Sequence, residues 1–122
     1  MLLRKLAAWF ILVFVLVSQA IAQVEISGTW QARYMLTDIT VHVNNRNDTV
    51  DGFVIVHDAQ NGTVYHFAGT FKGNTIHACH RDGHAFTGHL TSNARIVGTL
   101  TTNKNVSIQL TMTKTSQQDL SN

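Results

Sequence analysis

Residues 65–90, YHFAGTFKGNTIHACHRDGHAFTGHL, are the stretch from which the fold of this chain can be inferred. Apolar and polar side chains alternate along it, and turn-forming residues interrupt the alternation at 72–73 (Lys-Gly) and 81–83 (Arg-Asp-Gly). A period of two is typical of a strand with one buried face, and Gly-containing pairs favour tight hairpin turns. The stretch therefore predicts three consecutive antiparallel strands joined by two hairpins.

The same alternation continues on both sides of this stretch. Proline is absent, Thr, Val, Asn and Gly are abundant, and no segment after the first 22 residues shows helical periodicity. Connections this short leave no room for crossover helices, so neighbouring strands must pair antiparallel. We expect strands at residues 28–37, 39–45, 49–57, 63–71, 74–80, 84–90, 94–101 and 106–114.

A glycine flanked at two residues by apolar side chains recurs five times in these strands. Strand geometry places each glycine on the same face as its apolar flanks, where a missing side chain lets the strand bend. An inward row of such glycines favours a closed, eight-stranded up-and-down barrel over an open sandwich. The glycines are Gly28, Gly52, Gly69, Gly88 and Gly98.

The first 22 residues have the pattern of a signal peptide. Arg4 and Lys5 precede an apolar run at 6–17, and Ala20-Ile-Ala22 has the small residues that a signal peptidase recognises. The alternative is an uncleaved anchor, for which the run is shorter than the roughly 20 apolar residues that span a bilayer. We expect cleavage after residue 22, a barrel domain at 23–114, a polar tail at 115–122, and a secreted or periplasmic protein without a stable membrane anchor.

The charge and the cysteine content limit which partners and which disulfides this chain could have. Two of the nine Lys and Arg residues lie in the predicted signal peptide, which leaves seven against seven Asp and Glu. A neutral chain without a basic run gives no reason to expect a nucleic-acid partner. Cys79 is the only cysteine, so it is buried, free, or shared between two chains.

Gly28-Thr29-Trp30 at the start of the first expected strand resembles the Gly-x-Trp signature of the calycins, the group of meander barrels that contains lipocalins and avidins. The resemblance implies the barrel fold and a Trp30 that closes its floor. The chain lacks the C-terminal helix and disulfide of lipocalins, and the later Trp residues with which avidins hold biotin. Biotin binding is therefore not expected.

Strand register then determines which side chains share the inner face. A two-residue loop at 72–73 places Phe71 opposite Asn74 and Tyr65 opposite His80. For the next hairpin, a two-residue turn at 82–83 would place His77 and Cys79 inside. A three-residue loop at 81–83 keeps the apolar side chains inside, and burial sets register strongly. We expect the three-residue loop, with Ala78 opposite Phe86 and His80 opposite His84.

In this register the inner face is apolar at the floor and polar at the mouth. The candidate ligand-binding residues are Tyr34, Tyr65, His80, His84 and Trp30, and His57 is also expected at the mouth. Two imidazoles on directly opposed residues can share a metal ion, so His80 and His84 are candidate metal ligands. The alternative is a solvated hairpin end whose histidines have no role.

No catalytic pattern stands out: a Gly-x-Ser-x-Gly sequence is absent, and Asp38, Asp48, Asp58 and Asp82 fall in predicted turns. We therefore expect a non-catalytic protein without a cofactor that binds a small, partly apolar molecule at the barrel mouth. One alternative is a module that binds a protein partner, or a second copy of itself, through residues 44–48 and the outward side chains Phe53, Ile55 and Val97. The other is metal binding through His80 and His84.

Overall fold

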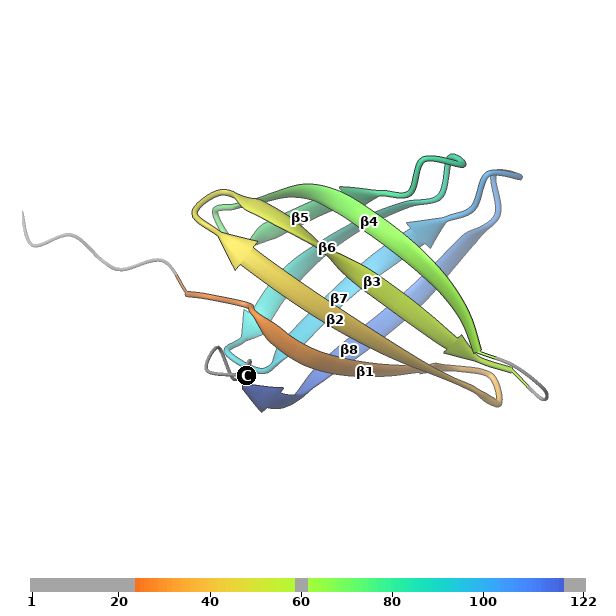
Figure 1. The fold of residues 1–122 in the computed structure, drawn as a ribbon, viewed down its shortest axis with the longest axis horizontal. Helices are drawn as coiled ribbons and strands as arrows, with labels where there is room; N and C mark the ends of the chain where they lie inside the picture. The colour runs from red at the N-terminus through yellow and green to blue at the C-terminus, as the bar shows by residue number, and fades with distance from the viewer. Residues whose placement is uncertain (1–23, 59–61, 118–122) are drawn as a thin grey trace, which may run out of the picture.

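The structure, a computed structural model, describes residues 24–58 and 62–117. The predicted signal peptide lies outside these residues. Eight antiparallel strands form one closed barrel in which each strand pairs with the next and β1 pairs with β8 (Figure 1). The predicted all-β, up-and-down barrel is confirmed. The strands are β1 (Gly28–Tyr34), β2 (Thr37–Arg46), β3 (Thr49–His57), β4 (Gly62–Lys72), β5 (Thr75–Cys79), β6 (Ala85–Ser92), β7 (Arg95–Thr101) and β8 (Ser107–Gln117).

The two ends of the barrel differ in their connections. One end carries the β2–β3, β4–β5 and β6–β7 turns together with the start of β1, and we call it the floor. The other end carries the β1–β2, β3–β4, β5–β6 and β7–β8 connections, and we call it the mouth. Among the described residues no helix is long and apolar enough to cross a membrane.

The floor is tightly packed around Trp30. Trp30 and Phe71 are both fully buried, and the indole Nε1 donates a hydrogen bond to the carbonyl oxygen of Ile26 at 3.0 Å. The ammonium group of Lys114 lies 5.9 Å from the centre of the Trp30 ring, within the range of a cation–π contact. The structure therefore places Trp30 at the barrel floor, as the resemblance to the calycins implies.

Asn45 fastens the segment before β1 to the floor. Its Oδ1 accepts from the backbone N–H of Ile26 at 3.2 Å, and its own N–H donates to Ser27 Oγ at 2.9 Å. Its Nδ2 donates to the carbonyl oxygens of Asn47 and Thr49. Asn45 was expected at the end of a strand at 39–45 and within a contact loop at 44–48. It lies in β2 and is buried, because its amide satisfies backbone groups that no strand partner reaches.

The β4–β5 hairpin differs from the expected register by two residues. Phe71 pairs with Ile76, not with Asn74, and the turn is formed by Gly73 and Asn74. Both turn residues have positive φ, 56° and 66°, which is what a type I′ hairpin turn requires. Because a shift by two keeps every side chain on its own face, Ile76 and Ala78 are still inside.

The β5–β6 hairpin has the expected three-residue loop. Ala78 pairs with Phe86, and the backbone N–H of His80 donates to the carbonyl oxygen of His84 at 2.8 Å. Gly83 adopts a positive φ of 106° and its N–H donates back to the carbonyl oxygen of His80. This part of the predicted register is confirmed.

The first hairpin turn comes earlier in the chain than expected. Tyr34 pairs with Thr37 across a turn of Met35 and Leu36, where the sequence predicted one strand through residue 37. Met35 has a positive φ of 57°, and both turn side chains are exposed. The turn was missed because neither residue is a usual turn former, so the apolar alternation continued through it.

The inward glycines serve close packing as well as curvature. Gly88 pairs with Gly98, and the ring of Phe86 lies over both. A Cβ on Gly98 would lie 2.5 Å from the ring edge of Phe86 and 2.5 Å from the carbonyl oxygen of Thr87. Only a residue without a side chain lets the Phe86 ring lie flat against this wall of the barrel.

Candidate functional site

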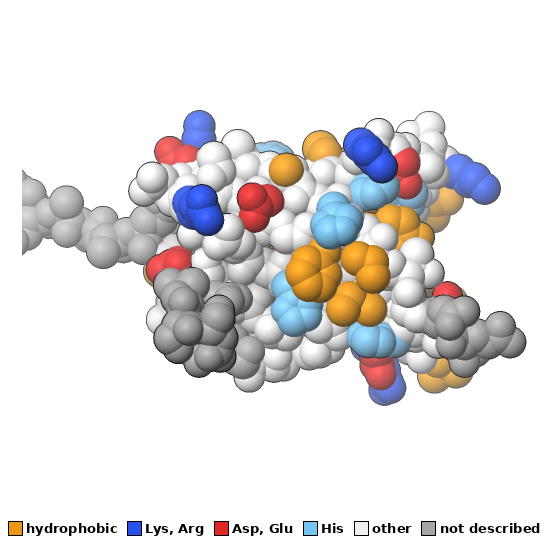
Figure 2. Space-filling view, in the orientation of Figure 1, with side chains coloured by type: hydrophobic (Ala, Val, Ile, Leu, Met, Phe, Trp, Pro, Cys, Tyr) orange, Lys and Arg blue, Asp and Glu red, His pale blue; other side chains and the backbone are white. Residues whose placement is uncertain are grey.

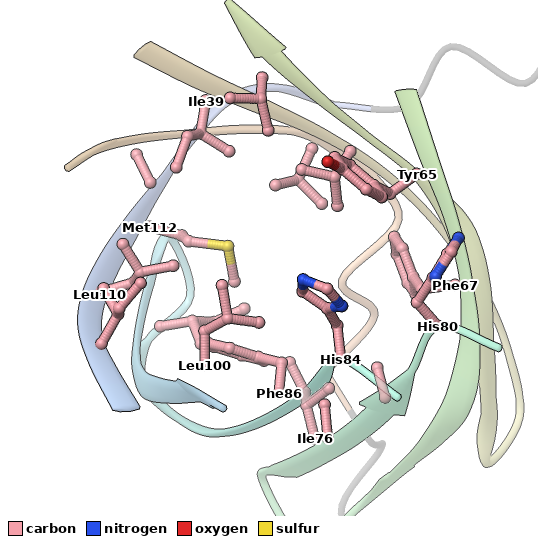
Figure 3. A pocket seen from close by; sticks show the side chains of 18 of the residues that line it. Ile39, Tyr65, Phe67, Ile76, His80, His84, Phe86, Leu100, Leu110 and Met112 are labelled. Carbon is pink, nitrogen blue, oxygen red and sulfur yellow. The ribbon is translucent and has the colours of Figure 1, made fainter. Parts of the chain in front are cut away.

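The barrel interior contains a cavity of about 370 Å³ between the floor and the mouth. Side chains from all eight strands line it, and nearly all of these side chains are aliphatic or aromatic (Figure 3). Representative wall residues are Val54, Phe67, Phe86, Leu100, Leu110 and Met112. The fully buried Trp30 and Phe71 are not among the lining residues. Aromatic side chains therefore seal the floor without filling the interior above it.

Polar groups are confined to the rim of this cavity. Tyr34, Tyr65, His80 and His84 all line it, and they come from β1, β4 and the two ends of the β5–β6 loop. The side chains of His80 and His84 are 21% and 28% exposed, so each contacts both the cavity and the solvent. These residues form the mouth that the sequence predicted, and a molecule entering the barrel would pass them.

Tyr65 packs against both imidazoles. Its ring centre lies 5.4 Å from that of His80, edge to face, and 5.9 Å from that of His84, nearly parallel. The two imidazole centres are 6.3 Å apart and perpendicular. Aromatic contacts at these distances restrict ring orientation, so the rim is held in one arrangement.

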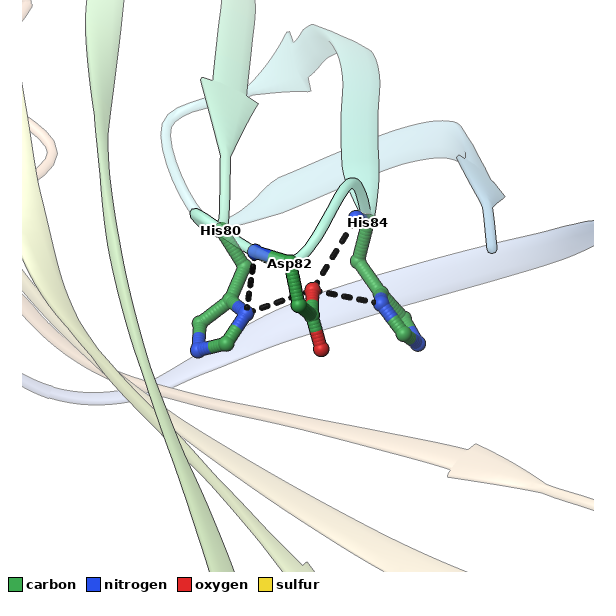
Figure 4. Close-up of side chains that lie close together, drawn as sticks. All are labelled: His80, Asp82 and His84. Carbon is green, nitrogen blue, oxygen red and sulfur yellow. Dashed lines mark hydrogen bonds and ion pairs between the residues drawn. The ribbon is translucent and has the colours of Figure 1, made fainter. Parts of the chain in front are cut away.

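Asp82 joins the two histidines. Its Oδ1 lies 2.6 Å from Nδ1 of His80 and 2.8 Å from Nδ1 of His84, and it also accepts from the backbone N–H of His84 at 3.2 Å (Figure 4). The backbone N–H of Asp82 in turn donates to Nδ1 of His80 at 3.2 Å. Both imidazoles are therefore tied through Nδ1 to the same residue, and each Nε2 points away from these contacts.

The histidine contacts change the acidity of this carboxyl. The hydrogen bond from His80 is the largest cause that lowers the pKa of Asp82 to about 2, from an ordinary value of 3.8. Hydrogen bonds from the backbone and side chain of His84 act in the same direction, and together they outweigh the opposing effect of desolvation. Asp82 is therefore an anion throughout the neutral range.

Asp82 is the site residue that sequence reasoning missed. It was interpreted as a turn former, although it lies two residues from a histidine on each side. In a hairpin loop the spacing His-x-Asp-x-His brings all three side chains to one end of the two strands. That spacing was the available signal.

His57 is not at the mouth. It was expected there, but Val54 and Val56 line the cavity, and strand alternation turns His57 to the outer surface. It is exposed and its Nε2 lies 2.9 Å from Thr40 Oγ1. The expectation considered only how close the residue lies to the strand end and not which face it occupies.

The other histidines lie outside the barrel, as predicted. His77 and His89 are exposed next to Thr87 and Thr75, and His42 lies next to Thr29. Cys79 is free and exposed on the same outer face as His77.

An apolar patch occupies the outer face of β3 and β4. It consists of Phe53, Ile55 and Val64; Ile55 pairs with Val64, which is 50% exposed. His42 and His66 flank Phe53, with ring centres 4.7 Å and 6.0 Å from it. Figure 2 shows such a group of apolar side chains bordered by histidines.

Comparison with known proteins does not assign the chain to a family. No protein-family model matches the chain, and no curated protein is significantly similar to it in sequence.

The depressed pKa of Asp82 predicts how this loop responds to acid. Because its pKa is lower in the folded chain than in the unfolded chain, the ionised carboxylate stabilises the fold fully above about pH 3.8, and the contribution is lost as the pH falls through about 2. We expect the difference in unfolding free energy between wild type and Asp82→Asn to shrink as the pH falls from about 4 toward 2. A carboxyl ¹³C titration of Asp82 with a midpoint near 3.8 would contradict this.

Proposed function

We propose that this chain is an exported, non-catalytic binding protein that holds a small, partly apolar molecule inside its barrel. The observation that carries the proposal is the unfilled interior. The aliphatic and aromatic side chains that line the barrel leave about 370 Å³ among them, a volume within the usual range of small-molecule sites. A protein that acts only through its surface has no use for such an interior, because unfilled space lowers stability.

The distribution of polarity supports an orientation for the bound molecule. Its apolar part would occupy the space between walls such as Val54 and Leu110, where burial of apolar surface supplies about 25 cal/mol per Å². Its polar group would lie at the rim, near Tyr65, His80 and His84. Tyr34 would contribute a further hydroxyl there. Trp30 would act indirectly, because it closes the floor and does not line the cavity.

The likeness to the calycins supports the same class of function. The chain shares with them the closed meander barrel and a buried Trp30 in the first strand. Lipocalins and avidins use the interior of such barrels for small ligands. Export, and a place outside the cytoplasm, stay proposals that depend on the predicted signal peptide at residues 1–22.

Filling the cavity should abolish binding. We expect N-phenyl-1-naphthylamine, a neutral apolar dye, to fluoresce on mixing with the wild-type protein. Val54→Trp, which adds an indole to the inner wall, should raise its Kd at least tenfold or remove the signal. Leu100→Trp acts from β7, on the opposite side of the barrel, and should do the same. Fluorescence titration measures both.

Val64→Trp is the matched control, since it makes the same change on the outer face of the neighbouring strand. It should bind the dye like wild type. Circular dichroism and thermal melts verify that each variant folds. An absent signal in wild type, or an unchanged Kd in both folded inner-wall variants, would refute the proposed site.

The outer patch supports a second candidate function, self-association. Phe53, Ile55 and Val64 are bordered by histidines and threonines and not by Lys, Arg, Asp or Glu at the paired positions, so two copies could meet there without repulsion between like charges. A strongly charged partner would meet no opposite charge on this patch. An apolar surface such as the same patch on a second copy of this chain would fit it better.

Sedimentation velocity tests this second candidate. Wild type should sediment as a dimer at concentrations of tens of micromolar, and Phe53→Lys should sediment as a monomer with an unchanged melting temperature. Val97→Lys places the same charge on the outer face of β7 and should leave the dimer intact. A monomeric wild type at 0.5 mM would exclude self-association through the patch.

A further inference from the structure

The β5–β6 loop holds three metal-ligating side chains in a fixed relation. His80 and His84 are linked through the backbone by the bond from His80 N–H to the carbonyl oxygen of His84, and Gly83 N–H closes the loop onto His80. Asp82 lies between them in sequence and in space (Figure 4). The three residues, spaced two apart in sequence, therefore lie together at one end of a single hairpin. No distant part of the chain needs to contribute a ligand.

The donor atoms of these residues converge. One ring nitrogen of each imidazole and a carboxylate oxygen of Asp82 all lie within 4.8 Å of one another. Donors bound to zinc at about 2.1 Å in tetrahedral geometry are roughly 3.4 Å apart. The nitrogen–oxygen contacts, 2.6 and 2.8 Å, need to lengthen by only about 0.6–0.8 Å to admit an ion. Asp82 can make that movement because its side chain is 37% exposed.

The chemical types of these three ligands also suit a metal ion. Two neutral imidazoles and one carboxylate favour divalent first-row transition ions such as Zn(II), and disfavour Ca(II) and Mg(II), which prefer oxygen donors. A metal ion bound between the imidazole nitrogens and the Asp82 oxygen would neutralise the charge of the carboxylate.

We infer that His80, Asp82 and His84 form a binding site for one divalent transition-metal ion at the rim of the barrel. Three protein ligands leave a tetrahedral ion one open position, which is the arrangement of zinc sites that bind water or a further molecule. Both imidazoles also line the cavity, so the ion would lie beside its entrance. The site is independent of the proposed cavity ligand, since it needs only the loop.

Tyr65 supports the site by packing against both of its imidazoles. Tyr65 contacts both imidazole rings and holds their orientations, as outer residues commonly do around metal ligands. The remaining neighbour in the loop, Arg81, is exposed and makes no contact with the three donors that the structure records.

Metal titration tests the inference directly. Untagged wild-type protein, titrated with Zn(II) in a calorimeter and weighed by native mass spectrometry, should bind one ion per chain. Replacing Zn(II) with Co(II) should give visible absorption bands of the intensity expected for a four-coordinate ion. His80→Ala and His84→Ala should each weaken binding at least tenfold, and Asp82→Asn should weaken it less, since an amide oxygen remains.

The controls come from the outer face of the same hairpin. His77→Ala lies on β5 and His89→Ala lies on β6, and both side chains are exposed and do not line the cavity. Both variants should bind Zn(II) and Co(II) like wild type, and melting temperatures establish that every variant is folded. Failure of wild type to bind at millimolar Zn(II), or loss of binding in the outer-face variants instead, would overturn the site. Neither result would affect binding of an apolar dye in the barrel, so the two proposals fail separately.

Discussion

Closure of β1 against β8 is the constraint on which the other features depend. Four residue pairs join these strands, with a register shift between Thr29 and Trp30, and the hydroxyl of Thr115 adds a bond to the carbonyl oxygen of Thr29. Because the ladder has no open edge, the inner face of every strand points at the same enclosed volume. Eight strands make that volume wide enough for side chains to line it, and at this size side-chain choice decides whether space is left.

Closure also separates the chemistry of the two ends. At the floor, Trp30 and the buried amide of Asn45 satisfy the backbone and exclude water. At the mouth, the β5–β6 loop carries its histidines and Asp82 on the rim. A molecule in the barrel would have one apolar end and one polar end available to it. The metal site and the cavity are adjacent for the same reason, although neither needs the other.

Strand alternation predicted the faces well, because it depends only on residue parity. The error in the β4–β5 register moved every pair by two residues, yet Ile76 and Ala78 stayed inside, since an even shift preserves the face. The same parity would have placed His57 outside, had it been counted from Val54 and Val56. Turns were less predictable, because the Met35-Leu36 turn adopts a positive φ that its composition does not favour.

Two features of the site could not be predicted from the alternation of side chains along the strands. The direction of the Asp82 side chain depends on the conformation of a loop, to which a period of two does not apply. The cavity depends on how the rings of Phe67 and Phe86 pack against glycines and smaller side chains, and this follows from the diameter of the barrel and not from the pattern.

A crystal structure of the protein under xenon pressure tests the central claim, an accessible apolar interior, most directly. Xenon occupies empty apolar cavities without needing a polar partner. The account predicts xenon inside the barrel, in contact with Val54, Phe86 and Leu110, with Trp30 still closing the floor. An interior filled by inward-turned aromatic side chains, with no xenon bound above Trp30, would contradict it.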